Sequence, residues 1–248
     1  MKKPFKDLFS TQASDYARYR PTYPKALFQF LARTARERAL VWDCGTGNGQ
    51  AAIELAQDFS RVIATDPSEK QIRSAPAHPR VEYRVEPAER TSLVAGSVDL
   101  VTVAQAFHWF RHAEFYTEVR RVARPGAHLA IWSYANARVT PEVDAAVGAF
   151  YSGVLGSYWE PERRWVEEGY RSIEVPFPAI SAPTFEMAAE WTCEQMVGYL
   201  GTWSALATYI QRQGQDPLPP AAEAIRRAWG NSATHTVTWP LVVRLFQL

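Results

Sequence analysis

The apolar positions in the first half of the chain follow two alternating patterns, and together these patterns predict a sheet covered by helices. Short apolar runs are typical of strands buried in a sheet, and they occupy residues 40–42, 61–65, 81–85, 98–104 and 128–133. Between them, apolar side chains recur at helical spacing at residues 24–38, 50–57 and 112–124. Strands that alternate with helices in this way are typical of an α/β fold with a parallel sheet.

The pattern is less regular after residue 136, where aromatic residues gather. Here we expect helices at residues 139–151, 194–212 (as one or two segments) and 221–229, strands at 184–192 and 234–248, and a stiff proline-rich loop at 216–220. Aromatic residues stand beside arginines at 158–159, 163–165 and 170–171. This combination would suit a small anionic or partly apolar ligand. The alternative is that most of these aromatic side chains form the core of a helical cap.

A glycine-rich turn follows the first strand and carries the candidate chemistry. Asp43 ends the strand, and Gly45, Gly47 and Gly49 follow at every second position. Glycine lets the backbone turn tightly and lets a ligand approach the peptide planes. A dinucleotide-binding turn would need glycine or alanine at the sixth position of the pattern, where this chain has Gln50. The carboxylate of Asp43 would also repel a pyrophosphate, so the turn favours a ligand with an ammonium group and no phosphate.

A second acidic residue stands where the second strand ends. Asp66 follows Asp43 by 23 residues, and an acidic residue about 20 positions after such a turn is placed to accept hydrogen bonds from ribose hydroxyls. The alternative role for Asp66 is to cap the helix that the following Pro67 begins. The two roles are compatible, and the spacing favours nucleoside binding.

The stretch LVWDCGTGNGQAA at residues 40–52 resembles motif I of the class I S-adenosylmethionine (SAM)-dependent methyltransferases. YARYRPTYP at residues 16–24 and QAFHWF at residues 105–110 resemble segments of small-molecule methyltransferases similar to trans-aconitate methyltransferase. The resemblance implies an α/β, Rossmann-like fold: a seven-stranded, mostly parallel sheet with an antiparallel last strand, helices on both faces and a helical cap. It also implies SAM as the cofactor and a small-molecule acceptor, which could be a carboxylate.

Under this interpretation the chain divides into four parts. Lid helices are expected at residues 1–36, a SAM-binding Rossmann-like core at 37–136, an aromatic-rich helical cap at 137–235 with a sheet strand near 184–192, and a final strand at 236–248.

By the resemblance, the cofactor site draws on the lid segment, the glycine-rich turn and the ends of the following strands. Tyr16 and Arg20 would reach the amino-acid end of SAM, where a guanidinium can pair with the SAM carboxylate. Their segment could instead be a purely structural amphipathic helix. Ala88 and Glu89 would flank the adenine, unless Glu89 is a solvated residue of an ordinary turn. The matched cofactor positions are Tyr16, Arg20, Asp43, Gly45, Gly47, Gly49, Asp66, Pro67, Ala88, Glu89, Gln105 and Ala106.

His108 is the candidate catalytic residue. It follows the fourth strand, and ligands of open α/β sheets bind beyond the carboxyl ends of the strands. His108 could deprotonate the acceptor as a general base, or it could be satisfied by a backbone carbonyl and only shape the pocket. Substrate contacts are expected from His108, Trp109, Trp165 and Tyr170. His112 lies four positions further on, but no third ligand accompanies the pair, so we expect no metal site.

Composition narrows the possible partners and compartment. The chain has 248 residues, 47% of them apolar, and a formal net charge of +1. A charge near zero argues against nucleic acid as a partner. No apolar stretch approaches the length of a membrane span, and the N-terminus lacks the apolar core of a signal peptide. Two cysteines, Cys44 and Cys193, indicate a reducing compartment. We therefore expect a cytoplasmic monomer or homodimer.

Two other functions are alternatives to a SAM-dependent methyltransferase. A non-catalytic SAM-binding regulatory protein would keep Asp43 and Asp66 but would need no acceptor pocket beside His108. A nucleotide-dependent oxidoreductase would need glycine at position 50 and room for a pyrophosphate, and the sequence offers neither.

Overall fold

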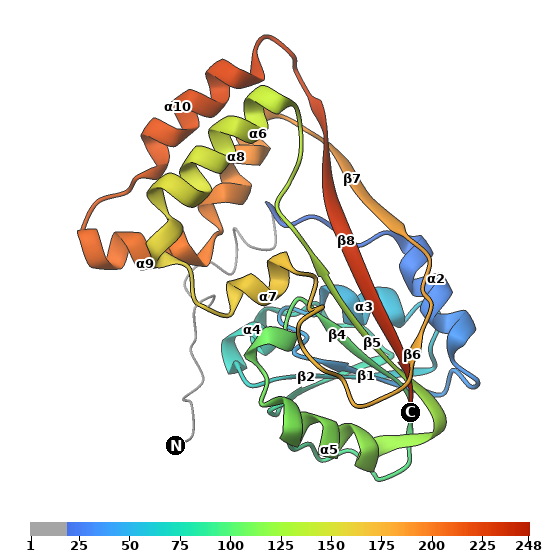
Figure 1. Ribbon diagram of the computed structural model, residues 1–248. Helices are drawn as coiled ribbons and strands as arrows, with labels where there is room; N and C mark the ends of the chain where they lie inside the picture. Colours follow the sequence, from blue (N-terminus) through green and yellow to red (C-terminus); the bar gives the residue numbers. More distant parts are fainter. Residues whose placement is uncertain (1–18) are drawn as a thin grey trace.

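The computed structural model describes residues 19–248, in which a single sheet of eight strands carries helices on both faces (Figure 1). The spatial order is β3-β2-β1-β4-β5-β8-β6, and β7 also pairs with β8. Neighbours from β3 to β5 are parallel, whereas β8 is antiparallel to β5, β6 and β7. The strands are β1 (Leu40–Cys44), β2 (Arg61–Asp66), β3 (Val81–Val85), β4 (Val98–Ala104), β5 (Ala123–Tyr134), β6 (Ala179–Ile180), β7 (Phe185–Trp191) and β8 (His235–Gln247).

The predicted fold class is confirmed, with one strand more than the seven expected. The additional strand, β6, has only two residues, which is too short for any periodicity to show. It pairs with the end of β8, while β7 pairs with the beginning of β8, from His235 to Leu241. The long β8 therefore belongs to two regions: its first half extends beyond the parallel sheet, and its second half lies beside β5.

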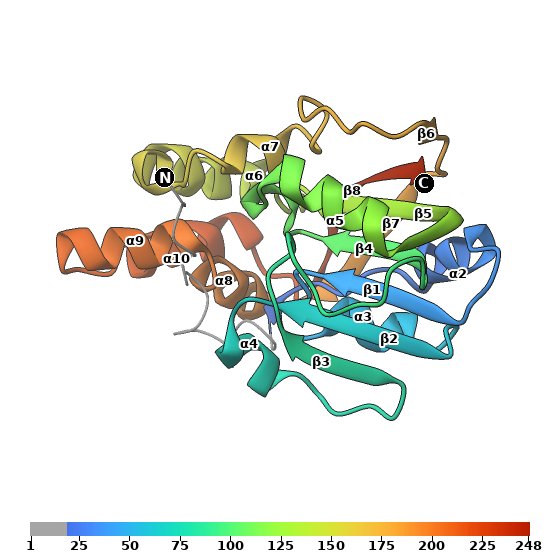
Figure 2. The ribbon, with the colours of Figure 1, turned by 90° about the horizontal axis from the view of Figure 1, so that it is seen from below.

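Two large tryptophans show how the sheet faces are covered. Trp42 of β1 and Trp132 of β5 are both fully buried, in separate core clusters. Trp42 packs against Phe115, with ring centroids 6.0 Å apart, and Trp132 packs against Phe28 at 6.3 Å. These partners lie on α5 and α2, which cover opposite faces (Figure 2). The helices around the sheet are α2 (Lys25–Thr34), α3 (Gln50–Leu55), α4 (Glu69–Ser74) and α5 (His112–Val122).

Helix α2 lies within the stretch predicted as a lid. The sequence predicts a sheet-covering helix at residues 24–38, but the domain division also places this stretch in a lid at residues 1–36. The structure shows the covering helix: Leu27, Phe28 and Leu31 of α2 are buried in the core. The remaining lid prediction rests on the segment before α2, and Tyr16 lies outside the described residues.

The cap stands at the end of the β7–β8 ribbon, where α6, α8, α9 and α10 gather (Figure 1). Trp191 and Trp239 of the ribbon meet at 4.6 Å, and Tyr199 packs against Trp203 at 5.9 Å, so these aromatic residues form a cap core. The cap elements are α6 (Pro141–Gly148), a π-helical turn (Ala149–Val154), α7 (Arg163–Glu167), α8 (Cys193–Gly201), α9 (Ser204–Gln213) and α10 (Leu218–Trp229).

Several boundaries differ from the sequence prediction, among them the following two. The proline-rich loop expected at 216–220 is shorter, because Leu218, Pro219 and Pro220 form the first turn of α10. Proline is tolerated there because the first N–H groups of a helix have no intrahelical partner. Strand β5 begins at Ala123 rather than at residue 128.

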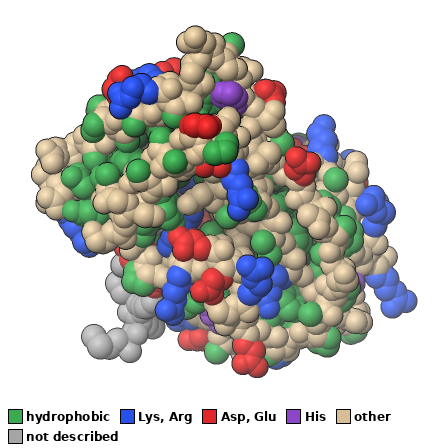
Figure 3. Space-filling model, turned by 45° about the horizontal axis from the view of Figure 1, so that its top comes forward, with side chains coloured by type: hydrophobic (Ala, Val, Ile, Leu, Met, Phe, Trp, Pro, Cys, Tyr) green, Lys and Arg blue, Asp and Glu red, His purple; other side chains and the backbone are tan. Residues whose placement is uncertain are grey.

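Surface charge, helix length and the cysteines can be compared with the expectations from composition. On the face shown in Figure 3, basic and acidic side chains are interspersed rather than separated by sign. Among residues 19–248, no helix combines the length and the apolar character needed to cross a bilayer. Cys44 and Cys193 are both free thiols.

Candidate active site

The glycine-rich turn is pinned to the neighbouring strand by its backbone. The amides of Gly45 and Thr46 both donate to the carbonyl of Thr65, at 2.8 and 3.0 Å. Gly45 has φ +68°, and a Cβ there would lie 2.6 Å from the Cβ of Ala106, so the close approach of the loop after β4 requires glycine. Gly47 has φ +56°, and a Cβ there would meet no atom within 4 Å. The space above Gly47 is therefore a cradle that a side chain would fill and that a ligand can enter.

Asp66 closes the same edge of the site from the end of β2. Its Oδ2 accepts a hydrogen bond from the amide of Gly47 at 2.9 Å, and its Oδ1 accepts one from the amide of Ser68 at 2.8 Å. A carboxylate offers about four lone-pair positions, so it can accept hydrogen bonds from two vicinal hydroxyls as well as from backbone amides. The side-chain cap of α4 is Ser68, whose Oγ accepts from the amide of Gln71. The helix-capping alternative for Asp66 is therefore wrong.

Asp43 lies beneath the turn and joins it to β4. It is fully buried, and it accepts hydrogen bonds from the hydroxyls of Thr46 at 2.6 Å and Thr102 at 2.8 Å. Burial raises the pKa of the Asp43 carboxyl to about 6, although these two hydrogen bonds act in the opposite direction. A positively charged ligand group nearby would favour the ionised form.

The loop after β3, which carries Ala88 and Glu89, is held from two sides. Ala88 is buried, and Glu89 Oε1 accepts a hydrogen bond from the amide of Arg111 at 2.9 Å. Glu89 thereby links its loop to the loop after β4. Pro67, which follows the end of β2, is exposed. The predicted adenine contacts of Ala88 and Glu89 remain predictions.

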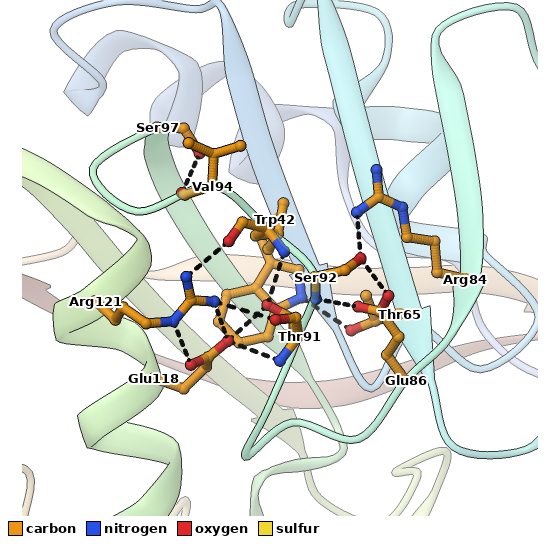
Figure 4. Close-up of polar contacts among 11 residues, drawn as sticks. Trp42, Thr65, Arg84, Glu86, Thr91, Ser92, Val94, Ser97, Glu118 and Arg121 are labelled. Carbon is orange, nitrogen blue, oxygen red and sulfur yellow. Dashed lines mark hydrogen bonds and ion pairs between the residues drawn. The ribbon is translucent and has the colours of Figure 1, made fainter.

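A buried carboxylate on α5 anchors the rest of this loop (Figure 4). Glu118 accepts hydrogen bonds from both the amide and the hydroxyl of Thr91 at 2.7 Å, and it is paired with Arg121 at 2.6 Å. Arg121 in turn donates to the carbonyl of Leu93 at 2.7 Å. This network is not predictable from the sequence, since without the fold Glu118 and Arg121 cannot be distinguished from an exposed helical ion pair.

Beyond β4, the chain bends sharply at Gln105. This residue has φ +53°, which non-glycine residues rarely adopt. Its side chain clamps the backbone of Tyr134: Oε1 accepts from the Tyr134 amide at 3.0 Å, and Nε2 donates to the Tyr134 carbonyl at 3.3 Å. The bend directs the next residues, Ala106 to Trp109, across the carboxyl end of the sheet. Such off-region conformations cluster at functional sites.

A pocket opens at this bend, between the sheet and the cap. Three parts of the chain contribute to its wall: the segment before α2, the loop after β4, and the cap. The lining residues are Arg20, Gln105, His108, Trp109, Trp159, Glu160, Arg163, Val166, Trp203 and Ser204. Of these, Arg20, Gln105, His108 and Trp109 are predicted from the sequence. Trp159 and Arg163 belong to the predicted cluster of aromatic residues and arginines at 158–165, but nothing local shows which face of a cap segment turns inward.

His108 is buried in the pocket wall and hydrogen-bonded through Nδ1. The partner is the phenol oxygen of Tyr170, at 2.9 Å. Burial lowers the pKa of His108 to about 3, and the positive charges of Arg163 and His112 act in the same direction. The imidazole is therefore neutral at physiological pH. The alternative that a backbone carbonyl satisfies His108 is wrong, since that contact belongs to His112, whose Nε2 lies 3.0 Å from the carbonyl oxygen of Phe107.

Two predicted substrate contacts are placed elsewhere. Tyr170 has no exposed surface and stands behind His108, outside the pocket lining. Trp165 also lies outside the lining, with its ring edge-on to His112 at 5.9 Å. Their roles as substrate contacts therefore stay predictions, and Tyr170 itself touches His108, which lines the pocket.

Two arginines bring positive charge to the pocket. Arg20 donates to the Tyr134 hydroxyl at 3.1 Å and to the carbonyl of Thr202 at 3.2 Å. Arg163 donates to Asn136 Oδ1 at 2.7 Å, and its guanidinium lies over the ring of Trp159 at 5.0 Å. Both guanidinium groups are held in place by neighbours, which is typical of an anion-binding site.

The arrangement can hold a nucleoside with a cationic group at the edge of β1 and β2, beside a pocket for a second molecule. The strand order, the turn with its acidic residue and Asp66 together define a SAM-dependent methyltransferase of class I. Among residues 19–248, no cluster of three His, Cys, Asp or Glu side chains could hold a metal ion.

Comparisons with known proteins agree with this class. A methyltransferase domain family matches residues 42–131. A protein of Dictyostelium discoideum described as a methyltransferase is 35% identical over 97% of this chain and 95% of its own length. A solved structure from Anaeromyxobacter dehalogenans, described as a type II methyltransferase, has 49% identity and a TM-score of 0.86 and covers 92% of this chain and 98% of its own. The chain belongs to the class I SAM-dependent methyltransferases.

Proposed function

We propose that this methyltransferase transfers the methyl group of SAM to a small anionic acceptor, and that the methylated group is a carboxylate. The observation that carries the proposal is the pocket beside the cofactor edge, which combines aromatic walls with the held guanidinium groups of Arg20 and Arg163. Ring faces suit the apolar body of a small molecule, and guanidinium groups suit a carboxylate. The resemblance to trans-aconitate methyltransferase supports the same acceptor class.

Residues already described fit the cofactor. Asp66 would accept the two ribose hydroxyls, the cradle above Gly47 would admit the nucleoside against the backbone, and buried Asp43 would favour the ammonium end. Bound SAM supplies an electrophilic methyl group on a positively charged sulfur, so the protein need not create one. The fit is chemical as well as geometric, because an anion beneath the turn opposes a phosphate-bearing cofactor.

The chain's own residues bind and orient the acceptor. Arg163 pairs with a carboxylate of the acceptor, while Trp159 and Trp203 cover its body and exclude water. Productive transfer needs the acceptor oxygen within about 3–3.5 Å of the methyl carbon and in line with the bond that breaks. A carboxylate oxygen is already a nucleophile at neutral pH, so no proton has to leave the acceptor.

The two alternative functions have less support. The oxidoreductase is set aside because the chain belongs to a methyltransferase family. A regulatory SAM-binding protein would not need the pocket beside His108, with its aromatic walls and two guanidinium groups.

The proposal is tested by incubating the purified protein with SAM and small mono-, di- and tricarboxylic acids, each beside its primary amide and its alcohol. We expect release of the demethylated cofactor with one or more acids and none with the matched amides. The product should be an ester that alkali hydrolyses and that is heavier than the acid by one methylene. Turnover with phenols or amines but with no acid would contradict the proposed acceptor.

A further inference from the structure

We propose that Tyr170 is a positioning residue that holds His108 as the neutral tautomer with its proton on Nε2, so that His108 donates a hydrogen bond to the acceptor instead of removing a proton from it. The inference rests on the proposed function in one respect only, namely that the acceptor binds in the pocket that His108 lines.

The geometry places the two side chains in one fixed arrangement. The His108 Nδ1 lies 2.9 Å from the Tyr170 phenol oxygen, the two rings are stacked with a 24° interplanar angle, and both residues are buried. Tyr170 has φ +60°, an unusual conformation for a tyrosine. Arg244 holds this backbone by donating to the carbonyls of Tyr170 and Ile173. The surrounding structure therefore fixes the phenol, which can fix the imidazole.

The direction of the hydrogen bond follows from the surroundings of the phenol. Within residues 19–248, the one side-chain hydrogen-bond partner of the Tyr170 oxygen is Nδ1 of His108, and the buried phenol has no exposed surface through which to reach water. Burial raises the pKa of Tyr170 well above its usual range, so the phenol keeps its proton. That proton is then donated to Nδ1 of His108. A neutral imidazole has one N–H, and with Nδ1 accepting, the proton must be on Nε2.

The second ring nitrogen is available to the pocket. His108 lines the pocket, and within residues 19–248 its one hydrogen bond is the Nδ1 contact with Tyr170. Because Tyr170 occupies Nδ1 and His108 lines the pocket, Nε2 is the ring nitrogen that can meet an acceptor there. The charged or titratable groups that face this ring are Arg163, His112 and, across the pocket, Arg20 and Glu160.

This arrangement defines which acceptors can react. An Nε2–H group can donate to the carboxylate oxygen that does not react, while the other oxygen attacks the methyl carbon. The new O–C bond forms as the S–C bond breaks, the electron pair remains on sulfur, and no proton is transferred. A neutral alcohol, phenol or ammonium group would need a base, and an imidazole whose conjugate acid has a pKa of about 3 is a poor one.

The tautomer is measured directly on the full-length protein labelled with ¹⁵N-histidine. We expect His108 to show an acceptor-type shift at Nδ1, a protonated-type shift at Nε2, and no titration between about pH 5 and pH 8. Tyr170→Phe should alter this pattern, whereas Tyr116→Phe is the matched control. The Tyr116 phenol is also mostly buried, but it donates to the carbonyl of Glu174. A proton on Nδ1 of His108 in the native protein would overturn the inference, whether or not either variant folds.

Steady-state kinetics with an acid that the enzyme methylates supply a second test. We expect kcat/KM to show no histidine-linked limb near pH 6.5, and we expect His108→Gln, which keeps a donor near the Nε2 position, to retain activity within about tenfold. A limb near pH 6.5 that His108→Gln removes would identify a base and overturn the inference. If the spectra show the proton on Nε2 but no acid is methylated, the proposed acceptor fails while the assignment of His108 stands.

Discussion

The proposed cofactor edge (Asp43, Gly47 and Asp66) and the proposed acceptor pocket beside His108 touch each other, yet they are built in different ways. At the cofactor edge, Asp43, Gly47 and Asp66 lie within one strand–turn–helix–strand unit, and backbone amides make most of the contacts. In the acceptor pocket, side chains come from segments far apart: Arg20 contacts Thr202, 182 positions away. Local geometry determines the first region, whereas packing of the cap on the core determines the second. Substitutions in the two regions should therefore affect different measured quantities.

The largest effect is expected from Gly45→Ala, because Gly45 is the point where the two regions meet. The new Cβ would lie 2.6 Å from the Cβ of Ala106, which has no flexible side chain to move aside, and the φ of +68° disfavours alanine as well. We expect a loss of about 2–5 kcal/mol in the free energy of unfolding. Binding of SAM should become undetectable by calorimetry.

Gly47→Ala is the matched control for this prediction. Its φ is also positive, but its Cβ would contact nothing within 4 Å, so only about 1 kcal/mol of stability should be lost. The new methyl group would occupy the cradle above Gly47. The binding free energy of SAM should therefore be reduced by more than the free energy of unfolding. Equal destabilisation of the two variants would show that the approach of Ala106 is not the constraint described here.

The same contrast explains how much the sequence could predict. Asp43, the glycines and Asp66 are predictable because they lie close together in the sequence. The turn and the strand ends set the position of each of them. Trp159 and Arg163 are not predictable as pocket residues, because their inward orientation depends on how α7 and the turn before it pack against the loop after β4. The role of Tyr170 as a direct substrate contact stays a prediction, and no local pattern shows that its phenol reaches His108 from behind. The two-residue β6 left no pattern at all.

A smaller effect, confined to the acceptor side, is expected from Arg163→Met. Methionine keeps much of the apolar stem over Trp159 but removes the charge that would pair with the acceptor carboxylate. We expect KM for the acid to rise about 10–100-fold, with the dissociation constant of SAM changed by less than about twofold. Steady-state kinetics and calorimetry measure the two quantities separately.

Arg164→Met controls for the loss of a positive charge on α7. Arg164 is exposed and lies over Trp165, away from the pocket lining. Its substitution should leave KM unchanged. If the two variants raise KM equally, the effect comes from long-range charge and not from a contact between Arg163 and the acceptor.

The smallest effect, confined to the cofactor side, is the pH dependence that Asp43 should impose on SAM binding. With a pKa of about 6 in the folded protein, Asp43 is mostly ionised at about pH 8 and half protonated at about pH 6. Because the ionised form of Asp43 favours a cationic ligand, the dissociation constant of SAM should rise about twofold as the pH falls from about 8 to about 6. His108 does not contribute, since its pKa of about 3 lies well below.

Stability should show the opposite trend for the same physical reason, and Asp43→Asn tests both. The folded protein holds the Asp43 proton at a pKa of about 6, against 3.8 for an unperturbed carboxyl. This group therefore adds stability at low pH, and the contribution is lost as the pH rises through about 6. Asparagine has no such proton, and the hydroxyls of Thr46 and Thr102 can reorient toward it. In chemical denaturation the variant should gain stability over the native protein as the pH rises, while its weaker SAM affinity stays constant with pH. A pH-dependent affinity that persists in Asp43→Asn would assign the titration to another group and separate Asp43 from the ammonium end of the cofactor.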